Sequence, residues 1–391
     1  MLRFQTAGES HGQGLVAFLS GLPAGLRIDF TYVNRELKRR QGGYGRGERM
    51  KIEADTAQFL SGMRHGITIG SPIIILIQNR DWENWKDALA VEAGDDTCAQ
   101  AKPVSAPRPG HADLAGCLKY DFHDARYVLE RASARETAAR VAAGAVAKLF
   151  LKEFGIEVAS HVIAVAGIKL ARENVPFDQV LALREREDMV LNCVDPETEA
   201  RMKAEVDRAL TTRDSVGGTF EVMAHGVPPG LGSCAQWDER LDGQLAQAMM
   251  SIQAVKAVEL GSGIANTASF GSQVHDEIAY DGAASRFTRK TNRAGGLEGG
   301  ITNGEDVVVR GYLKPIATLR QPLESVDLET KQTVKAAYER SDVCVVPAAG
   351  VVGEAMLALV LARAFLEKFG GDALAETRRN FDAYREQVRR F

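Results

Sequence analysis

The sequence predicts an α+β fold in which a few very apolar helices pack between sheets of antiparallel strands. Three observations support this prediction. The strand-like segments are short and irregularly spaced, they do not alternate regularly with helices, and the strongest helices are apolar on most of their faces. Without regular alternation a doubly wound parallel sheet is disfavoured, and a helix that is apolar all round is expected to be buried.

The first third of the chain is rich in short strand-like segments. Residues 14–19 and 25–30 flank a Gly-Leu-Pro-Ala turn, which predicts a β-hairpin. Residues 67–78 are another strand candidate. Residues 39–49 are rich in glycine and arginine and have no apolar periodicity, so we expect a loop there.

Three apolar helices are predicted further along. The first begins near Ser133, which has the capping-box spacing to Glu136, and runs to Phe154. The second covers about residues 239–260, where apolar side chains recur at three- and four-residue spacings. The third, residues 350–369, is almost wholly apolar and is therefore expected at the centre of the fold.

The segments between these helices have clearer periodicity. Strands are expected at residues 156–170, 219–227 and 307–313. A polar helix is expected between residues 195 and 216, because it begins with an Asp-Pro pair and ends before two glycines.

Two helix ends resemble each other. Residues 150–155 and 365–370 both follow an alanine-rich apolar helix and both end in glycine. A degenerate internal duplication would explain this likeness, and so would chance similarity between two helix ends.

Composition narrows the class of protein. Of 391 residues, 45% are hydrophobic and 26% are charged, as in ordinary soluble proteins. The net charge of −4 argues against a dedicated nucleic-acid or membrane-surface protein, which is usually basic. The five cysteines include no Cys-x-x-Cys pair, so a reducing compartment fits better than a disulfide framework, and no metal site is expected.

The first residues and the longest apolar run bear on where the protein is located. The first residues have neither the apolar region of a signal peptide nor a transit-peptide pattern. The longest purely aliphatic run, residues 73–77, is far too short to span a bilayer. We therefore expect a cytoplasmic protein.

A glycine-flanked histidine lies near the start of the chain. Residues 8–12 match the Gly-x-Ser-x-Gly nucleophile elbow, but an elbow needs a helix after it and here strand-like sequence follows. We reject that interpretation. His11 remains either an exposed turn residue or a proton donor or acceptor.

Arginines gather in residues 39–49, where four fall within eleven residues. Guanidinium groups bind carboxylates and phosphates in a bidentate manner, and glycines allow the backbone to approach a ligand closely. A solvated basic turn, a glycine-arginine RNA-binding segment and a site for a small polyanion all fit this pattern. The acidic net charge favours the small anion.

Two further motifs place arginines at a turn and at the start of a helix. Arg108 and His111 flank a Pro-Gly turn, which fixes unusual backbone geometry. Arg131 and Arg135 lie where a helix begins, and free backbone N–H groups there favour anions. A plain helix salt bridge would also account for Arg135.

The C-terminal third adds three loops. Residues 292–304 are rich in glycine and suit a planar or phosphorylated ligand, and residues 314–318 end a strand with a lysine and a threonine that suit phosphate. Asp342 follows Arg340 closely, which fits either an ion pair or a catalytic acid. No phosphate-binding P-loop, dinucleotide fingerprint or zinc-ligand spacing is present. The residues alone therefore predict an enzyme with an arginine-rich site for a multiply anionic small molecule.

These blocks, in this order, resemble the chorismate synthase family along the whole chain. The matching stretches are residues 8–12, 40–49, 108–113, 131–143, 292–304, 314–318 and 340–354. The resemblance implies a single domain over residues 1–391, a β-α-β sandwich with central helices between two antiparallel sheets, and a homotetramer. It also implies a lyase of aromatic amino acid biosynthesis in the shikimate pathway, which eliminates phosphate from 5-enolpyruvylshikimate 3-phosphate to give chorismate.

The family's reaction is a 1,4-anti elimination that is redox-neutral overall yet requires reduced flavin mononucleotide (FMN). By resemblance, His11 would be the general acid at the leaving phosphate, and His111 would supply a proton to the reduced flavin. Asp342 would face nitrogen 5 of the flavin and assist removal of the carbon 6 hydrogen. The residues that would hold the substrate's carboxylates and phosphate are Arg40, Arg46, Arg49, Arg108 and Arg135.

The resemblance also assigns cofactor contacts. A nicotinamide phosphate would bind at Arg40 and Arg46, with NADPH as a candidate reductant. No obvious insertion of the kind found in bifunctional relatives is present, which favours an outside reductase. His275 stands where many relatives have asparagine, which affects one local contact. The flavin contacts would be Arg131, Ala132, Ser133, Gln253, Ala254, Gly299, Lys314, Pro315, Ile316, Ala317, Thr318 and Arg340.

Two rival hypotheses remain. A nucleic-acid-binding protein would use the glycine-arginine loop, but only one aromatic residue, Tyr44, lies there for base stacking. A different flavin- or phosphate-ligand enzyme on the same scaffold would bind flavin without turning over the shikimate ester.

Overall fold

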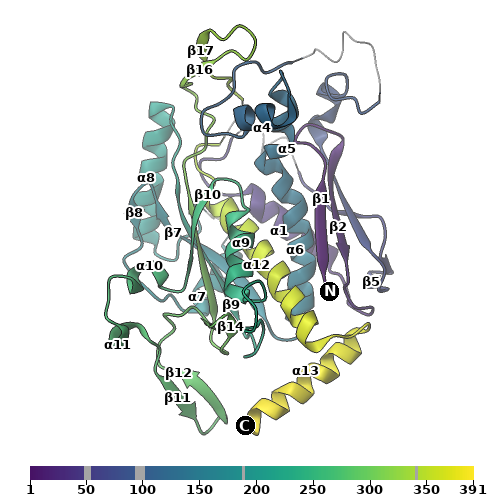
Figure 1. Ribbon diagram of the computed structural model, residues 1–391, viewed down its shortest axis with the longest axis vertical. Coiled ribbons are helices and arrows are strands. Elements are labelled where there is room, and N and C mark those ends of the chain that lie inside the picture. The colour runs from purple at the N-terminus through teal and green to yellow at the C-terminus, as the bar shows by residue number, and fades with distance from the viewer. Residues whose placement is uncertain (48–53, 93–101, 187–189, 340–341) are drawn as a thin grey trace.

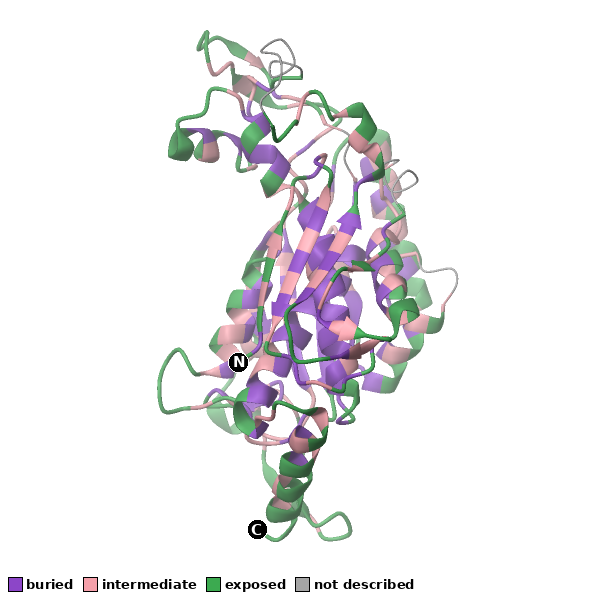
Figure 2. Cartoon of the chain, turned by 90° about the vertical axis from the view of Figure 1, so that its right-hand side faces the viewer, coloured by how far each residue is buried: buried purple, intermediate pink, exposed green. Residues whose placement is uncertain are grey.

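The computed structural model describes residues 1–47, 54–92, 102–186, 190–339 and 342–391 (Figure 1). Two antiparallel sheets and the helices packed against them form the centre. Figure 2 shows buried residues concentrated in this middle region, with exposed residues dominating both ends of the long axis.

The first sheet is four-stranded, antiparallel and ordered β1-β2-β6-β3. Side chains alternate along its central strands, so that Leu15, Ala17 and Leu19 of β2 are buried on the inner face. Strand β6 contains the aliphatic run of residues 73–77. It pairs with β2 and buries every second residue in the same way. The strands are β1 (Arg3–Ala7), β2 (Gly14–Ser20), β6 (Ile73–Gln78) and β3 (Gln58–Phe59).

The second sheet is five-stranded, antiparallel and ordered β10-β15-β9-β7-β8. Phe220 and Val222 of its central strand β9 are fully buried. The strands are β10 (Val255–Leu260), β15 (Val307–Leu313), β9 (Gly218–His225), β7 (Glu157–Val165) and β8 (Ile168–Lys169).

Two apolar helices, α6 (Thr137–Lys152) and α12 (Val346–Phe369), pack against each other in the core (Figure 1). α6 contacts β2 and β6, whereas α12 contacts β7 and β9. A Cβ on Gly144 of α6 would lie only 2.3 Å from the Cβ of Ala355 of α12, so glycine is what lets the helices approach. α12 is long and apolar enough to cross a membrane, but 89% of its most apolar window is buried inside the protein, as a core helix would be.

Other elements surround this centre. The larger helices are α1 (Phe30–Gln41), α4 (Asp113–Tyr120), α5 (Arg126–Ala132), α7 (Phe177–Ala182), α8 (Pro196–Thr212), α9 (Leu241–Met250) and α13 (Leu374–Arg389). Short helical turns are η1 (Arg80–Asn84), η2 (Ala134–Glu136), η3 (Leu183–Glu185), α10 (Gly263–Asn266) and α11 (Gly271–Val274). Small hairpins pair β4 (Met63–Arg64) with β5 (Ile67–Thr68), β11 (Ile278–Asp281) with β12 (Arg286–Arg289), β13 (Leu297–Glu298) with β14 (Ile301–Thr302), and β16 (Glu324–Val326) with β17 (Thr333–Lys335).

A buried ionic network ties the core helices to α1. Glu354 of α12 is fully buried and accepts from Arg39 Nη2 at 2.8 Å and from Ser160 Oγ at 2.7 Å. Lys148 of α6 contacts Glu354 and donates to Glu36 Oε2 at 2.5 Å. Burial raises the pKa of Glu354, but Arg39 and Lys148 outweigh it, so that this pKa lies well below its usual range. The last turn of α1 is therefore fixed to α6 and α12 by charge.

The predicted α+β class is confirmed, and so are most of its elements. The helices expected at residues 133–154 and 350–369 are α6 and α12, and the polar helix is α8. The strands expected at residues 156–170, 219–227 and 307–313 include β7, β9 and β15.

Two local predictions are wrong. Residues 14–19 do not form a hairpin with residues 25–30, because β2 pairs instead with β1 and β6. The helix expected at residues 239–260 ends at Met250, and its second half is strand β10. Ala254 ends the turn between them with φ of +69°, a conformation that a helix cannot continue.

Two helix boundaries also differ. Arg39 and Arg40 belong to the last turn of α1 and not to the predicted loop, because helix side chains there join the buried network. Ser133 does not form the expected capping box. Its hydroxyl accepts from Arg135 N at 3.3 Å at the start of η2, while the carboxylate of Glu136 bonds Arg140 and Thr6.

Candidate functional site

Several predicted site residues gather where α1 ends and α6 and α12 begin. Arg40 Nη1, in the last turn of α1, donates to Thr137 Oγ1 at 3.3 Å, in the first turn of α6. A Cβ on Gly43, just after α1, would lie 3.0 Å from Pro347 in the first turn of α12. Two helix N-termini therefore lie beside the loop that follows α1, and helix N-termini favour anions.

Arg40, Asp55, Arg135 and Asn79 form a buried arginine cluster at this point, and each is at most 6% exposed. Arg40 Nη2 and Arg135 Nη1 donate to the Asp55 carboxylate at 2.9 Å and 2.6 Å. Arg135 Nε and Nη2 also donate to Asn79 Oδ1, at 3.0 Å and 2.9 Å. Among the described residues, the two guanidinium groups of the cluster share one carboxylate.

The electrostatics of the arginine cluster follow from its burial. Burial lowers the pKa of Arg40 to about 10; Asp55 opposes this shift, and Arg135 and Arg46 add to it. Burial raises the pKa of Asp55, but the two arginines that it contacts outweigh this effect and hold that pKa below its usual value. Arg40 Nε is buried and has no hydrogen-bond partner among the described residues. An anion bound there would accept a hydrogen bond from this donor.

Asp342 lies beside Arg46 at the edge of the same region. Its Oδ1 accepts from Gly47 N at 2.6 Å, and its Oδ2 lies 3.5 Å from Arg46 Nη1. The side chain of Asp342 is 20% exposed, so a carboxylate remains accessible next to the arginines.

The turn that carries His11 is firmly held, although its glycines suggest flexibility. Asn79 Nδ2 donates to the backbone oxygens of Glu9 and Gly12 at 3.1 Å and 2.8 Å. Gly8 has φ of +98°, and a Cβ there would meet Gly14 O at 2.2 Å. Because Asn79 also accepts from Arg135, one amide joins this turn to the arginine cluster.

His11 is bonded to a carboxylate and stacked on an aromatic ring. Its Nδ1 lies 2.9 Å from Glu130 Oε1, and its backbone N donates to Glu130 Oε2 at 2.8 Å. Its ring stacks on Trp85 with centroids 4.1 Å apart and planes inclined by 24°. The His11 side chain is 12% exposed.

His111 has a corresponding arrangement within a single turn. Its Nδ1 lies 2.5 Å from Asp113 Oδ1, and Arg108 Nε donates to Asp113 Oδ2 at 2.8 Å. Burial raises the pKa of Asp113, but His111 and Arg108 outweigh it, so that this pKa lies well below its usual range. Arg108 Nη1 also donates to Thr318 Oγ1 at 2.8 Å. Arg108 thus donates hydrogen bonds to Asp113 and Thr318, and it also lies next to His111.

The loop of residues 314–318 lies against the His111 turn. Lys314 Nζ donates to Gly110 O, and Lys314 N donates to Ala254 O at 3.0 Å. Ser215 Oγ donates to Ile316 O at 2.8 Å, which fixes the middle of the loop. The structure therefore brings together the stretches 253–254 and 314–318, two of those that the resemblance assigns to flavin.

A second set of assigned flavin residues surrounds Thr6 of β1. Arg131 Nη2 donates to Thr6 O at 2.9 Å, and Thr6 Oγ1 donates to Glu136 at 2.5 Å. Gln253 Nε2 donates to Glu136 at 3.3 Å, whereas Gln253 Oε1 is buried without a hydrogen-bond partner in the described part of the chain. Ser133, which follows Ala132 at the end of α5, has its hydroxyl 3.1 Å from that of Ser10.

Gly299 does not join these residues within the chain. It lies between β13 and β14, and its neighbour Gly300 accepts from Leu241 N at the start of α9 at 3.0 Å. Gln253 follows the other end of α9, which is ten residues or about 15 Å long. Among the described residues, the contacts of Gly299 include no other assigned flavin residue, so its flavin assignment stays a prediction.

Arg49 and Arg340 lie outside the described residues, so their predicted roles stay predictions. His275 lies in the described loop after α11, where a Cβ on Gly271 would meet its ring at 3.4 Å. Among the described residues, no group of three histidine, cysteine or acidic side chains could hold a metal ion.

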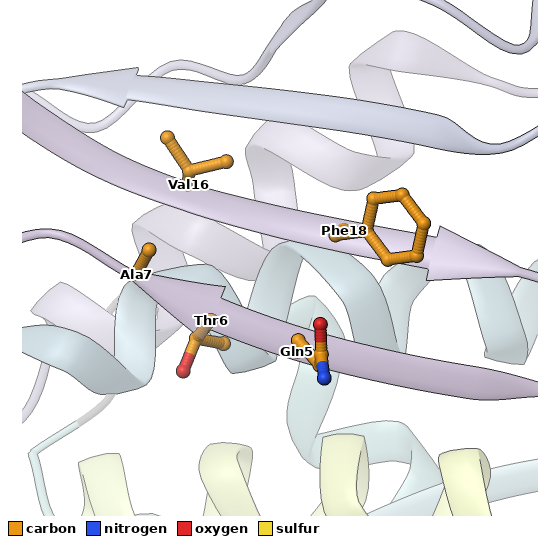
Figure 3. A pocket seen from close by; sticks show the side chains of 5 residues that line it. All are labelled: Gln5, Thr6, Ala7, Val16 and Phe18. Atoms are coloured by element: carbon orange, nitrogen blue, oxygen red, sulfur yellow. The ribbon is translucent and has the colours of Figure 1, made fainter.

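A surface cavity of about 450 Å³ opens along β1 and β2 (Figure 3). Gln5, Thr6, Ala7, Val16 and Phe18 line it, and none of them is a predicted site residue. Thr6 alone connects this cavity to the assigned flavin contacts.

Sequence reasoning missed the partners of the site residues. Asp55 and Asn79 organise the arginines, and Glu130 and Trp85 hold His11. None of them stands in a motif, so no spacing signal pointed to them. Asp113 is different, because it lies in the same short block as Arg108 and His111.

The class of protein follows from this arrangement. An α+β scaffold that concentrates buried cations beside helix N-termini, with two histidines held by carboxylates, is suited to proton transfer on a small, multiply charged anion.

Comparison with known proteins makes the assignment specific. A family model described as chorismate synthase matches residues 2–366. Curated chorismate synthases from Acidobacterium capsulatum and Solibacter usitatus are 65% and 64% identical, each over the full length of both chains. A solved structure titled as a chorismate synthase superposes with a TM-score of 0.79 at 44% identity, covering 100% of this chain and 99% of the other. The chain belongs to the chorismate synthase family and is therefore a carbon–oxygen lyase of aromatic amino acid biosynthesis.

Proposed function

We propose that this chain converts 5-enolpyruvylshikimate 3-phosphate to chorismate and phosphate, with reduced FMN as a required cofactor. The observation that carries the proposal is the buried arginine cluster beside two helix N-termini. Arg40 and Arg135 share the carboxylate of Asp55, with Arg46 nearby. A substrate with two carboxylates and a phosphate supplies the opposite charge in the form that arginines bind best.

The residues present fit a flavin. Gln253 Oε1 is a buried acceptor without a partner among the described residues, and a flavin ring offers an N–H donor. Ala254, which has a left-handed backbone, follows Gln253, and its carbonyl oxygen accepts from Lys314 N at 3.0 Å. Reduced flavin would supply transient electron donation to the substrate. Arg131 and residues 314–318 would hold its polar groups.

The chain's own side chains would manage the protons. The elimination breaks the carbon–oxygen bond to phosphate and removes the carbon 6 hydrogen, so the proton count balances without net oxidation. His11 would donate a proton to the leaving phosphate. His111 would hold a proton near the flavin, and the accessible carboxylate of Asp342 would assist removal of the hydrogen. Arg108 would bind an anionic group of the substrate.

Several finer features of the family are part of this proposal. The two sheets with α6 and α12 between them would form a single-domain β-α-β sandwich. The half-exposed apolar side chains on the outer face of β2 and β6 are suited to contacts in a homotetramer. We further propose a cytoplasmic location, NADPH binding at Arg40 and Arg46, and dependence on an outside flavin reductase.

An anaerobic assay tests the proposal. The full chain is mixed with chemically reduced FMN and 5-enolpyruvylshikimate 3-phosphate, and chorismate absorbance and phosphate release are followed together. We expect equal amounts of both products. Binding of flavin and ester without product would contradict the proposed reaction. Repeating the assay with oxidised FMN and NADPH tests the reductase, and product formation there would contradict dependence on an outside reductant.

A further inference from the structure

We propose that Glu130 is a positioning residue that holds His11 so that its Nε2 faces the reacting phosphate. This inference rests on the proposed general-acid role of His11. Glu130 lies in α5, outside the motifs found in the sequence, so neither the motifs nor the resemblance gave it a role.

Glu130 holds His11 through both its side chain and its backbone. Its carboxylate lies 2.9 Å and 3.0 Å from His11 Nδ1 and accepts from the His11 backbone N at 2.8 Å. Its backbone O accepts from Ser10 N at 2.9 Å. An ionised carboxylate only accepts hydrogen bonds, so the Nδ1 that faces it carries the hydrogen. Nε2 is then the ring nitrogen that exchanges a proton with another group.

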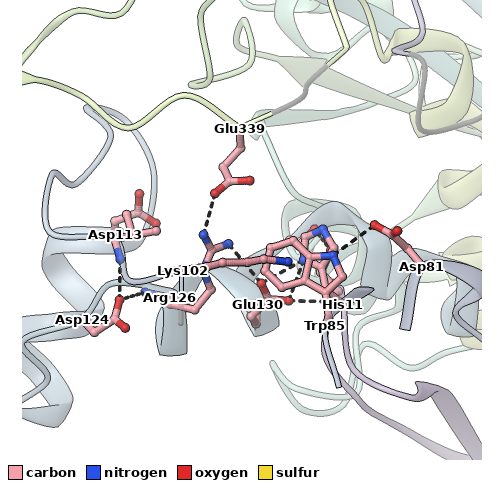
Figure 4. A network of polar contacts seen from close by, with 12 residues as sticks. His11, Asp81, Trp85, Lys102, Asp113, Asp124, Arg126, Glu130 and Glu339 are labelled. Atoms are coloured by element: carbon pink, nitrogen blue, oxygen red, sulfur yellow. Dashed lines mark hydrogen bonds and ion pairs between the residues drawn. The ribbon is translucent and has the colours of Figure 1, made fainter. Parts of the chain in front are cut away.

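The carboxylate is suited to this task because it is buried and ionised. Glu130 is 3% exposed, and burial raises its pKa. Its contacts with His11 outweigh burial and, with the charge of Arg126, hold the pKa below its usual value. Figure 4 shows Glu130 between His11 and Arg126, and Arg126 Nη2 reaches on to Glu339 at 2.9 Å. A carboxylate that stays ionised keeps accepting from Nδ1–H and so holds the imidazole in one orientation.

Trp85 fixes the plane of the same ring. The indole stacks on His11 and is itself anchored by its Nε1, which donates to Asp81 Oδ2 at 3.1 Å. Lys102 Nζ lies 3.8 Å from the centre of the Trp85 ring. The stack sets the tilt of the imidazole and the carboxylate sets its rotation, so together they leave one orientation.

A series at Glu130 tests the proposal in the full chain with reduced FMN. We expect Glu130→Ala to lower kcat by about 10–10²-fold, as for other residues that orient a functional histidine, while KM changes less than about threefold. Glu130→Gln keeps an oxygen for Nδ1–H, so we expect a smaller loss of kcat. Glu339→Gln is the matched control, because it removes one carboxylate from the same network without contacting His11. Equal kcat in the control and both Glu130 variants would overturn the proposal.

A spectroscopic readout separates positioning from mere folding. In a Trp82→Phe/Trp237→Phe background, Trp85 is the only tryptophan, and its emission reports on the imidazole stacked on it. The charged groups described around this pair are Glu130 and Arg126 of α5, Asp81 beside the indole and Lys102 over it. We expect Glu130→Ala to change the Trp85 emission towards that of His11→Ala, because the imidazole is no longer held in the stack, and Glu339→Gln to leave the emission nearly unchanged.

The two readouts distinguish this inference from the role of His11 itself. His11→Ala should abolish the effect of the stack on Trp85 emission, which identifies its source. If His11→Ala kept full activity, the general-acid role would fail, whereas the emission series would still report on the contact with Glu130. Emission of a folded Glu130→Ala protein equal to that of the unchanged protein, with folding checked by its melting temperature, would overturn the positioning role.

Discussion

The two histidines of the site are held by different means. His111 takes its carboxylate from Asp113, two residues further along the same turn, and Arg108 from that turn grips the same carboxylate. His11 takes its carboxylate from Glu130, 119 residues away on α5, and adds an aromatic stack. The first arrangement is local and forms with its turn. The second exists only once α5 has packed against the N-terminal segment.

The charges around the two carboxylates differ as well. Arg108 donates to Asp113 from Nε and from Nη2, so a full guanidinium neutralises that carboxylate. Among the described residues, the arginine paired with Glu130 is Arg126, at 3.4 Å, and Arg126 is shared with Glu339. The charge of Glu130 is therefore more available to His11 than that of Asp113 is to His111.

Removing Asp113 should have the largest effect on stability. Asp113→Ala leaves Arg108 buried without its carboxylate, which costs about 3–5 kcal/mol for a broken buried pair. The measurement is the free energy of unfolding by denaturant. Arg363→Ala, in an exposed helix pair, is the control and should change it by less than about 1 kcal/mol. Equal effects from both would mean that Arg108 and Asp113 do not act as a buried pair.

Replacing either histidine should chiefly affect turnover. His11→Ala and His111→Ala should each lower kcat by about 10–10³-fold with little change in melting temperature, judged from the usual range for acid–base groups. Chorismate formation with reduced FMN checks this. If both variants retain full activity, the assigned proton roles are wrong.

Coupling energies should sharpen the comparison between the two pairs. Double-mutant cycles on kcat/KM, with His11 and Glu130 in one cycle and His111 and Asp113 in the other, should each give about 0.5–3 kcal/mol. The His11 cycle should be the larger, because Glu130 is less neutralised. Coupling near zero in the His11 cycle would show that the two residues act independently.

Arg46 should affect substrate binding more than chemistry. Arg46→Ala removes a cation beside Asp342 and should raise the substrate's dissociation constant about 10-fold or more, the effect of one lost charged hydrogen bond. Equilibrium binding of the ester without flavin measures this directly. An unchanged dissociation constant would rule out a substrate contact.

Acid should weaken the local pair gradually, and this is the smallest effect. The pKa of Asp113 is lower in the folded protein than in the unfolded chain. Its contribution to stability is therefore complete above the unfolded value of about 4 and is lost as pH falls toward the folded value. Unfolding curves between about pH 5 and pH 3 should show stability falling with pH, and Asp113→Asn should flatten that fall. A slope unaffected by Asp113→Asn would place the acid sensitivity elsewhere.

Features of the fold and of the site that have a local signature in the sequence could be predicted. α6 and α12 are apolar on most of their faces, and Arg108, His111 and Asp113 form one short block. The second half of the predicted helix at residues 239–260 was wrong, because a short apolar run fits helix and strand equally and Ala254 gives no sign of its turn.

Partners that meet only through folding could not be predicted. Asp55 lies 80 positions from Arg135, and Glu130 lies 119 positions from His11. An isolated acidic residue resembles any solvated one until the chain is folded. The resemblance to a family supplied the candidate ligand-binding residues, but not the carboxylates and amide that hold them in place.

The adjacent arginines at the end of α1 have a consequence for the protein without substrate. Arg39 anchors the end of α1 to Glu354 in the core, and the carboxylate of Asp55 holds the side chains of Arg40 and Arg135 together. Folding therefore holds like charges together before any ligand arrives, and the resulting repulsion works against the native state. A multivalent anion that binds there relieves that repulsion as well as adding its own contacts. The melting temperature should then rise with inorganic phosphate more steeply than with chloride at equal ionic strength, because only an ion that binds the native state shifts the folding equilibrium.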